Sequence, residues 1–286
     1  MKQDKIIGAI LLLVALSAIS GLALITVFIF REGAPIVLRM GAGHFFLTSD
    51  WEPSHGKFGI LSMIGGSLAV TAGAAIIGVT FSLSLAIVLT QFSPPELSAA
   101  LKPAIELLAG IPSVVYGFVG VVTLVPLIRH TLGGPGLSVL AASIVLGIMI
   151  LPTITSIAID ALQAVPPTYL EGSIALGATR WQTVTMVILR AARSGIVAAV
   201  ILGMGRAIGE TMAVIMVAGN ALEFPHSLLD PVRTLTSNIA LEMGYASGEH
   251  RQALFATGVT LFVIITLLNV AALGFSRRRT VRRRVG

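Results

Sequence analysis

Two oppositely charged residues, Arg206 and Glu210, stand near the middle of the long apolar run IVAAVILGMGRAIGETMAVIMVAG. A charge at the centre of a bilayer costs about 2.5 to 3.5 kcal/mol on insertion scales, so such residues usually face a bundle interior or an aqueous path. One helical turn separates the two residues, which places them close enough to pair. The run therefore predicts either a salt bridge that locks helix packing or a pathway for a charged substrate.

The guanidinium of Arg206 suits an oxyanion, because its forked donors match oxyanion acceptors and it keeps its charge when dehydrated. On this hypothesis Glu210 holds the arginine when no substrate is present and repels a bound anion. In the same run Gly205 and Gly209 form a GxxxG pattern, which predicts the close approach of a neighbouring helix.

A second stretch, PPTYLEGSIALGATRWQTVTMVILRAARSG, begins at Pro166 between two apolar runs and predicts a soluble two-helix hairpin. Gly177 stands between the two helices, where a tight turn favours a residue that tolerates positive φ. Two capping boxes mark the helix starts: Thr168 with Glu171, and Thr179 with Gln182. The second helix carries a largely apolar stripe for a partner or the bilayer surface: Trp181, Val184, Thr185 and Ile188.

The elements that must position these residues are membrane spans, because mean hydropathy is +0.95 and only 11% of residues are charged. A helix needs about 20 apolar residues to cross the hydrocarbon. Six segments qualify: Ile6 to Phe30, Ile64 to Phe92, Ala104 to Ile128, Leu137 to Leu162, Ile196 to Ala218, and Ala253 to Phe275. In the third span Pro112 removes a backbone donor and predicts a kink or local unwinding.

Basic residues predict the sidedness of these spans. With both termini inside, the inner side holds Lys2, Lys5, Lys102, Arg180, Arg190, Arg193 and the six arginines of the final RRRTVRRRVG; the outer side holds Arg31, Arg39, Lys57, Arg129, Arg233 and Arg251. The hairpin is therefore expected in the cytoplasm, and the basic tail is expected to be a topology anchor rather than a nucleic-acid site. Of the two outer loops, Arg31 to Phe58 and Asn220 to Gln252, the second is expected to carry a short helix lying on the outer surface.

The sequence lacks the motifs typical of several classes of protein. The chain has no cysteine, no evident metal cluster and no GxxxxGK[ST] loop, so it cannot supply a nucleotide site of that kind itself. Its five histidines form no recognisable motif, which argues against an enzyme. An ion-coupled anion carrier or channel that uses Arg206 is one possible function, although no inverted repeat is detectable and the expected cytoplasmic hairpin argues against it.

The hairpin resembles the EAA loop of the membrane subunits of type I ATP-binding-cassette importers. Glu171, Gly172 and Ser173 stand in place of Glu-Ala-Ala, and Gly177 follows after three residues. At the Ile-x-Leu-Pro ending of that motif this sequence has Val187, Ile188 and Leu189, with Arg190 in place of the proline. Three further segments are similar to phosphate-specific permeases of this family: ELLAGIPSVVYG from Glu106, GSIALGATRWQTV from Gly172, and ILGMGRAIGETMAVIMVAGN from Ile201.

The resemblance implies an all-α, MetI-like permease with six transmembrane helices in a bacterial or archaeal cytoplasmic membrane. Residues 1–57 would hold the first helix and outer loop, 58–275 the permease domain with a coupling loop at about 163–195, and 276–286 the basic tail. It implies three kinds of partner: a second homologous permease, two cytoplasmic ATPase subunits that bind ATP and Mg, and an external phosphate-binding protein. This chain itself would need no cofactor or metal.

The resemblance also implies roles for particular residues. Arg206 and Glu210 match the charged pair of the fifth helix in the phosphate-specific permeases and would line the substrate pathway. The ATPase coupling residues would be Glu171, Gly172, Ser173, Gly177, Arg180 and Trp181. Sulfate and molybdate stay open as alternative substrates, because one arginine offers the same donors to every tetrahedral oxyanion; only the resemblance selects phosphate.

Overall fold

The computed structural model describes the backbone of residues 2–281 and the side chains of residues 7, 8 and 10–271. The side chains of Lys2, Lys5 and the basic tail, on which the sidedness prediction partly rests, lie outside this range. The described chain is mostly helical, as predicted for the fold class. Its one departure is a two-residue antiparallel hairpin, β1 (Trp51–Glu52) with β2 (Lys57–Phe58), joined by the 3₁₀ turn η1 (Pro53–His55).

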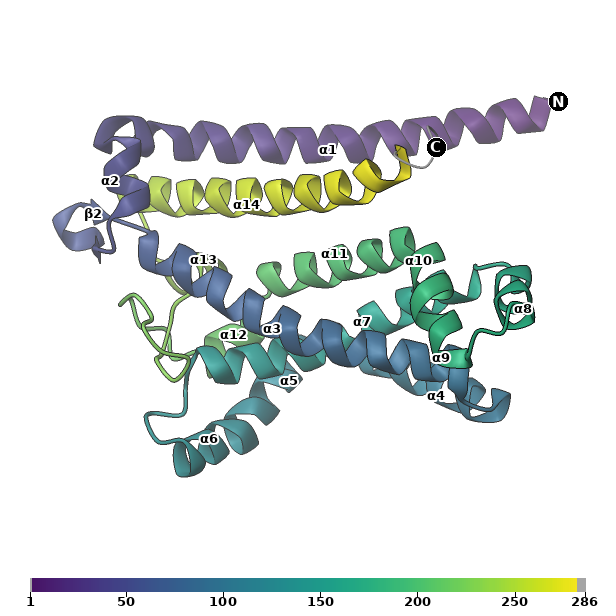
Figure 1. Ribbon diagram of the computed structural model, residues 1–286. Coiled ribbons are helices and arrows are strands. Elements are labelled where there is room, and N and C mark those ends of the chain that lie inside the picture. The colour runs from purple at the N-terminus through teal and green to yellow at the C-terminus, as the bar shows by residue number, and fades with distance from the viewer. Residues whose placement is uncertain (1, 282–286) are drawn as a thin grey trace.

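The first and last helices, α1 (Lys2–Met40) and α14 (Gly248–Val281), lie antiparallel and side by side (Figure 1). Edge-on ring contacts join them, with centroids 5.6 Å apart for Phe28 and Phe255. Both helices extend beyond the predicted spans, and α1 continues through Pro35. Because the start of α1 and the end of α14 lie at the same end of the molecule, these two helices fit an even number of crossings (Figure 1).

A second pair, α3 (Leu61–Ile87) and α7 (Val139–Gln163), forms the centre of the main hydrophobic core. Glycines allow the close approach: a Cβ added at Gly78 would lie 2.6 Å from the Ile150 side chain. Ser82 donates a hydrogen bond to the Leu151 carbonyl at 3.1 Å, next to Pro152 inside α7. These contacts give α7 a fixed position from which its residue Thr153 can reach a neighbouring helix.

Two of the predicted spans are broken. The third divides into α4 (Pro95–Ala109), α5 (Ser113–Val119), the π turn η3 (Gly120–Leu124) and α6 (Val125–Thr131). Pro112 lies in an extended conformation before α5, so it ends one helix and begins another instead of kinking a continuous one; proline cannot donate, and it disfavours helix in the residue before it. The fifth span divides into α11 (Arg193–Gly209) and α12 (Met212–Val217).

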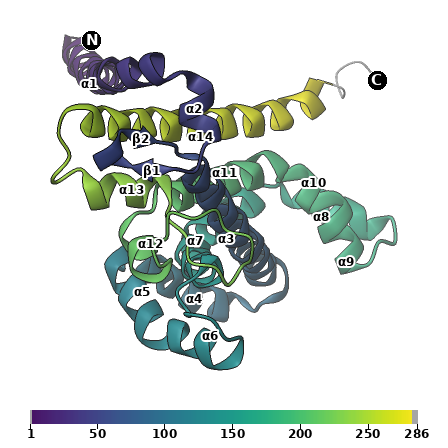
Figure 2. The ribbon, with the colours of Figure 1, turned by 90° about the vertical axis from the view of Figure 1, so that its left-hand side faces the viewer.

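The hairpin and the end of α3 lie at the same end of the molecule as the start of α1 and the end of α14 (Figure 1), and the hairpin projects to one side of α3 and α7 (Figure 2). The hairpin consists of α8 (Pro167–Ala175), α9 (Arg180–Gln182), the π turn η4 (Thr183–Ile188) and α10 (Leu189–Ala191). Helix α3 continues into another π turn, η2 (Val88–Phe92). The segment 180–191 and α11 meet at an angle of 72°.

The opposite end holds a second hydrophobic cluster beneath the β-hairpin. It joins α1, α2 (Ala42–Leu47), the β-hairpin, α13 (Leu235–Glu242) and α14 through buried Ile36, Phe45, Trp51, Leu235 and Leu254. The short helix predicted for the outer surface is present, but it does not lie on the surface: all four of its polar side chains, Thr236, Ser237, Asn238 and Glu242, are buried among its neighbours. The expected outer loops are therefore a packed cap.

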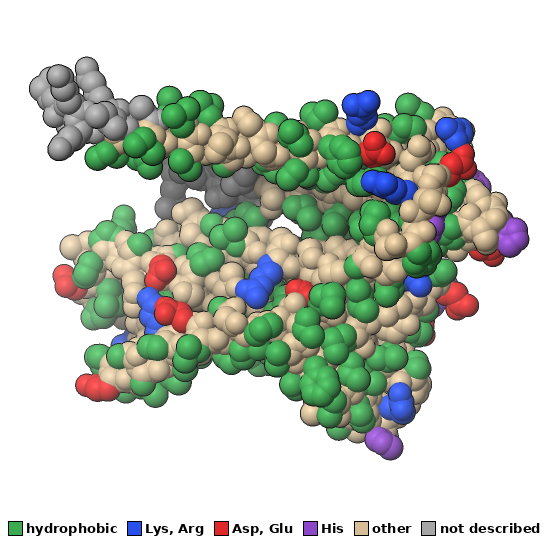
Figure 3. Space-filling model, turned by 180° about the vertical axis from the view of Figure 1, so that it is seen from behind, with side chains coloured by type: hydrophobic (Ala, Val, Ile, Leu, Met, Phe, Trp, Pro, Cys, Tyr) green, Lys and Arg blue, Asp and Glu red, His purple; other side chains and the backbone are tan. Residues whose placement is uncertain are grey.

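The surface agrees with a membrane location. Hydrophobic side chains cover much of the molecule's length, and most charged side chains lie toward its two ends (Figure 3). Within the described residues, five helices are long and apolar enough to cross a membrane, or six when the bent pair 180–191 and 193–209 is included.

Candidate functional site

The candidate pathway lies where the fifth span breaks. Helix α11 ends at Gly209, and Glu210 is extended, with φ −68° and ψ 132°. The Glu210 side chain accepts a hydrogen bond from the Ala213 N–H at 3.1 Å. It thereby satisfies one of the free N–H groups at the start of α12. The Glu210 carboxylate thus caps the helix after the break.

Arg206 does not pair with Glu210 in this conformation. Its guanidinium donates a hydrogen bond to Thr153 Oγ1 of α7 at 3.1 Å. Among the described side chains, no carboxylate oxygen lies within 4.0 Å of it. The salt-bridge alternative is wrong here, because the break removes the helical turn that would have stacked the two residues. An arginine has five N–H donors, so most of them are available to an oxyanion.

The GxxxG prediction is also wrong within this chain. A Cβ added at Gly205 or Gly209 meets no described heavy atom within 4 Å. The close approach occurs instead at Gly203, where an added Cβ would lie 2.5 Å from the Ile154 side chain of α7. Packing against α7 therefore uses a different face of α11.

A third helix contacts the break. The Thr236 hydroxyl, at the start of α13, donates a hydrogen bond to the Glu210 carbonyl at 2.8 Å. Thr153 and Thr236 carry no motif, and each comes from a segment far from residues 206–210 in sequence. Only the folded chain identifies them as neighbours of Arg206 and Glu210.

The hairpin turn follows the sequence prediction at its centre. Gly177 has φ +83°, a conformation that other residues adopt at a cost. The second capping box is present: Gln182 N donates to Thr179 Oγ1 at 3.3 Å, and Thr179 N donates to Gln182 Oε1 at 2.8 Å. The first, Thr168 with Glu171, is wrong because α8 begins two residues earlier than it predicts: its N-cap is Pro166 and its first helical residue is Pro167.

Most of the proposed coupling residues face outward. Glu171, Gly172, Gly177 and Arg180 are exposed, Trp181 is 63% exposed, and Leu176 at the tip is 90% exposed. Ser173 is half-buried, and its hydroxyl lies 2.9 Å from that of Thr183 across the hairpin. The predicted stripe is split, since Val184 and Ile188 are buried in the chain while Trp181 stays at the surface.

The hairpin is anchored on the end of α3. The Arg180 guanidinium carbon lies 5.4 Å from the centroid of the Phe92 ring, and the Trp181 ring centroid lies 6.4 Å from it. Phe92 ends the π turn of α3. Besides its two chain connections, the hairpin therefore has an aromatic and cationic contact with the membrane helices.

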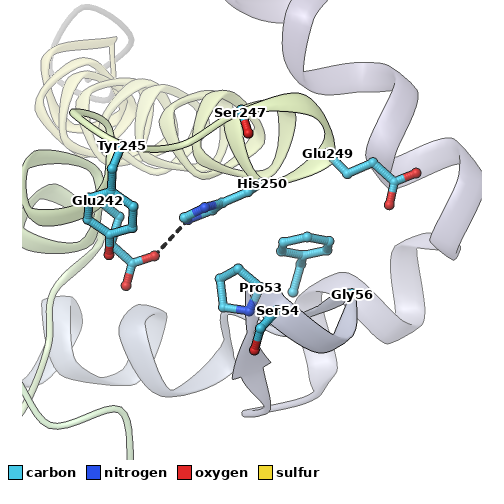
Figure 4. A pocket seen from close by; sticks show the side chains of 9 residues that line it. Pro53, Ser54, Gly56, Glu242, Tyr245, Ser247, Glu249 and His250 are labelled. Atoms are coloured by element: carbon cyan, nitrogen blue, oxygen red, sulfur yellow. Dashed lines mark hydrogen bonds and ion pairs between the residues drawn. The ribbon is translucent and has the colours of Figure 1, made fainter.

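The outer end holds a pocket of about 510 Å³ between the β-hairpin and the start of α14 (Figure 4). Beneath it lies a polar group that we call the outer cluster: Trp51, Arg233, Glu242 and His250. Arg233 lies 2.6 Å from Glu242 Oε1, and Glu242 Oε2 is 2.8 Å from both the Trp51 and the His250 ring nitrogens. Sequence reasoning missed this cluster, because its four residues are divided between the two predicted outer loops.

Residues 78–281 match the family described as "Binding-protein-dependent transport system inner membrane component". The probable ABC transporter permease protein YqgH of Bacillus subtilis is 45% identical over 93% of this chain and 89% of its own length. The phosphate transport system permease protein PstC of Haemophilus influenzae is 37% identical over 93% and 89%.

Solved structures share the fold. A chain of the MetNI methionine ABC transporter in an inward-facing conformation aligns with a TM-score of 0.61 at 21% identity, over 77% of this chain and 95% of that one. A chain from a bacterial ABC transporter involved in alginate import aligns with a TM-score of 0.63 at 16% identity, over 93% and 95%.

Proposed function

This chain belongs to the family of binding-protein-dependent transport system inner membrane components, and from that premise we propose that it is a PstC-type permease subunit of an ATP-driven phosphate importer. The chain is a multi-pass transport component of the cytoplasmic membrane rather than an enzyme. Several relatives named PstC, at 35 to 37% identity over most of their lengths, support phosphate as the substrate.

The complex would contain a second, PstA-type permease, two PstB-type ATPase subunits and an external PstS-type phosphate-binding protein. ATP and Mg would be bound by the ATPase subunits. Residues 1–57 would form an accessory span and outer cap, and 58–275 the permease domain with its coupling loop at about 163–195. The basic tail, 276–286, would remain in the cytoplasm.

The observation that carries the pathway proposal is the state of Arg206. It lies in the last turn of a helix that stops inside the predicted span, and it is held by one neutral hydroxyl. In transporters, interrupted membrane helices place charged and backbone groups around a substrate near the bilayer midplane. A phosphate passing the break at Glu210 would find guanidinium donors free to bind it.

The coupling loop would supply the motion. Its exposed tip at Leu176 and the adjacent Glu171 and Trp181 offer a surface to an ATPase subunit. When the ATPases close on ATP, a displaced hairpin would move α7 and α11 through the chain and α3 through Phe92. Helix α11, which carries Arg206, would then shift relative to α7, which carries Thr153.

A complementation experiment tests the proposal. Cells lacking this chain should regain uptake of labelled phosphate when it is restored, and excess sulfate should not compete. Arg206→Ala in a fully assembled complex should reduce uptake at least tenfold, because the oxyanion loses a charge-assisted partner. Arg31→Ala, an exposed arginine of α1, is the matched control and should leave uptake unchanged.

Other outcomes would point elsewhere. Sulfate competition would indicate a different oxyanion, and gradient-driven uptake by the purified chain alone in liposomes would indicate a secondary carrier. Unchanged uptake by assembled Arg206→Ala would remove Arg206 from the pathway.

A further inference from the structure

Helix α13 contacts the break at Glu210 with its first turn and the outer cluster with its last residue. Its first turn carries Thr236, which donates to the Glu210 carbonyl at the break beside Arg206. Its last residue is Glu242, the centre of the outer cluster. Six positions separate them, about 9 Å along a helix axis. The pathway and the outer pocket are thus joined by one short, rigid element.

The inner end of α13 is held by a chain of buried hydroxyls with one possible direction. The Glu210 carbonyl can only accept, so Thr236 must be the donor. The Thr234 hydroxyl, 3.1 Å away, must then donate to Thr236, and the Ser237 hydroxyl, 2.8 Å from Thr234, must donate to Thr234. Thr234 also accepts from the Ser237 N–H at the helix cap. Such chains strengthen each bond, so the break is fastened to the start of α13.

The outer end of α13 is held just as closely. Glu242 is 7% exposed. Its Oε1 atom accepts a hydrogen bond from Arg233, and its Oε2 atom is bonded to the ring nitrogens of Trp51 and His250. Trp51 belongs to the β-hairpin and His250 to α14, and both elements wall the pocket (Figure 4). A protein that seats on this pocket must press on the groups that fix Glu242.

We propose that Thr236 is a positioning residue for transport, through which α13 transmits the state of the outer cluster to the break at Glu210. This rests on the proposed function, in which an external binding protein delivers phosphate at the outer end. Docking there displaces the β-hairpin or the start of α14. Because Glu242 is bonded to both elements, α13 moves as a unit and its hydroxyl chain moves the Glu210 carbonyl. The link makes opening of the pathway depend on docking.

The test uses the assembled complex in proteoliposomes with the phosphate-binding protein and inorganic phosphate. Thr236→Val removes the hydroxyl at nearly constant volume, and Trp51→Phe removes the indole N–H to Glu242. Each should reduce phosphate transported per ATP hydrolysed about five- to tenfold, as expected for one lost hydrogen bond. Thr236→Ser, which keeps the donor, should restore wild-type coupling.

The double variant carries the decisive result. Thr236 and Trp51 have no hydrogen-bond partner in common, and substitutions at sites without a shared partner normally have additive effects. Two breaks in one linkage should instead cost no more than either alone. Thr266→Val, an exposed threonine of α14 bonded only within its own helix, is the matched control. Wild-type coupling in Thr236→Val, or additive losses in the double variant, would overturn the proposal. If the unmodified complex fails to move phosphate, the proposed function is at fault instead.

Discussion

At the scale of single residues, the charge of Glu210 suggests a salt bridge with Arg206, but in the structure Glu210 acts as a hydrogen-bond acceptor. Its side chain caps α12 through Ala213, and its carbonyl accepts from Thr236. Both contacts use oxygen atoms as acceptors, and neither requires a negative charge. The break in the fifth span is therefore maintained by hydrogen bonds, and Arg206 is left with Thr153.

Substitution at Glu210 should separate capping from charge. Glu210→Gln keeps an oxygen acceptor and should change the stability of the complex by less than about 0.5 kcal/mol. Glu210→Ala loses the cap and should cost about 1 kcal/mol, the usual value for a lost N-cap acceptor. The apparent Tm of the purified complex in detergent measures both. Equal losses in the two variants would show that the charge, and not the cap, stabilises the break.

At the scale of elements, local hydrogen bonds and a tertiary contact together fix the conformation of the hairpin. The Thr179 capping box and the αL turn at Gly177 set the angle between its helices. Arg180 and Trp181 then fasten the second helix to Phe92, where a π turn ends α3. A loop held in this way can transmit a displacement rather than absorb it.

Two glycines of the hairpin should respond oppositely to alanine. Neither would bring a new Cβ within 4 Å of a described atom, but Gly177 has φ +83° while Gly172 lies inside α8. Gly177→Ala should destabilise the hairpin by about 1 to 2 kcal/mol, and Gly172→Ala should stabilise α8 by about 0.5 to 1 kcal/mol. Amide hydrogen exchange over residues 167–191 of the purified chain reports both. Protection that changes in the same direction in both variants would contradict the turn geometry.

At the scale of the whole molecule, the long uninterrupted spans were predictable and the broken ones were not. The length of the apolar segment alone identifies α1, α3, α7 and α14, because each of these helices contains one continuous hydrophobic run. The break after Gly209 depends on Thr236, which lies 26 residues further along the chain. The outer cluster likewise assembles from separate segments, whereas the hairpin turn was predictable because Gly177 and Thr179 act locally.

The topology can be checked on a chain that contains no cysteine. Ser54→Cys in the outer β-hairpin and Glu96→Cys at the start of α4 place exposed thiols beyond opposite ends of α3. A membrane-impermeant maleimide should label Ser54→Cys on whole cells and Glu96→Cys only in inside-out vesicles. Labelling of both from one side would contradict the predicted sidedness.

The position of Arg206 in the last turn of α11 has a further consequence for how long an anion stays there. The carbonyl end of a helix carries about half a negative charge, which stabilises a nearby cation. The same partial charge opposes any anion that the guanidinium holds. Conduction requires binding that is strong enough for entry and weak enough for exit. In the proposed pathway, the end of α11 would therefore shorten the residence time of an anion bound to Arg206 without help from the Glu210 carboxylate.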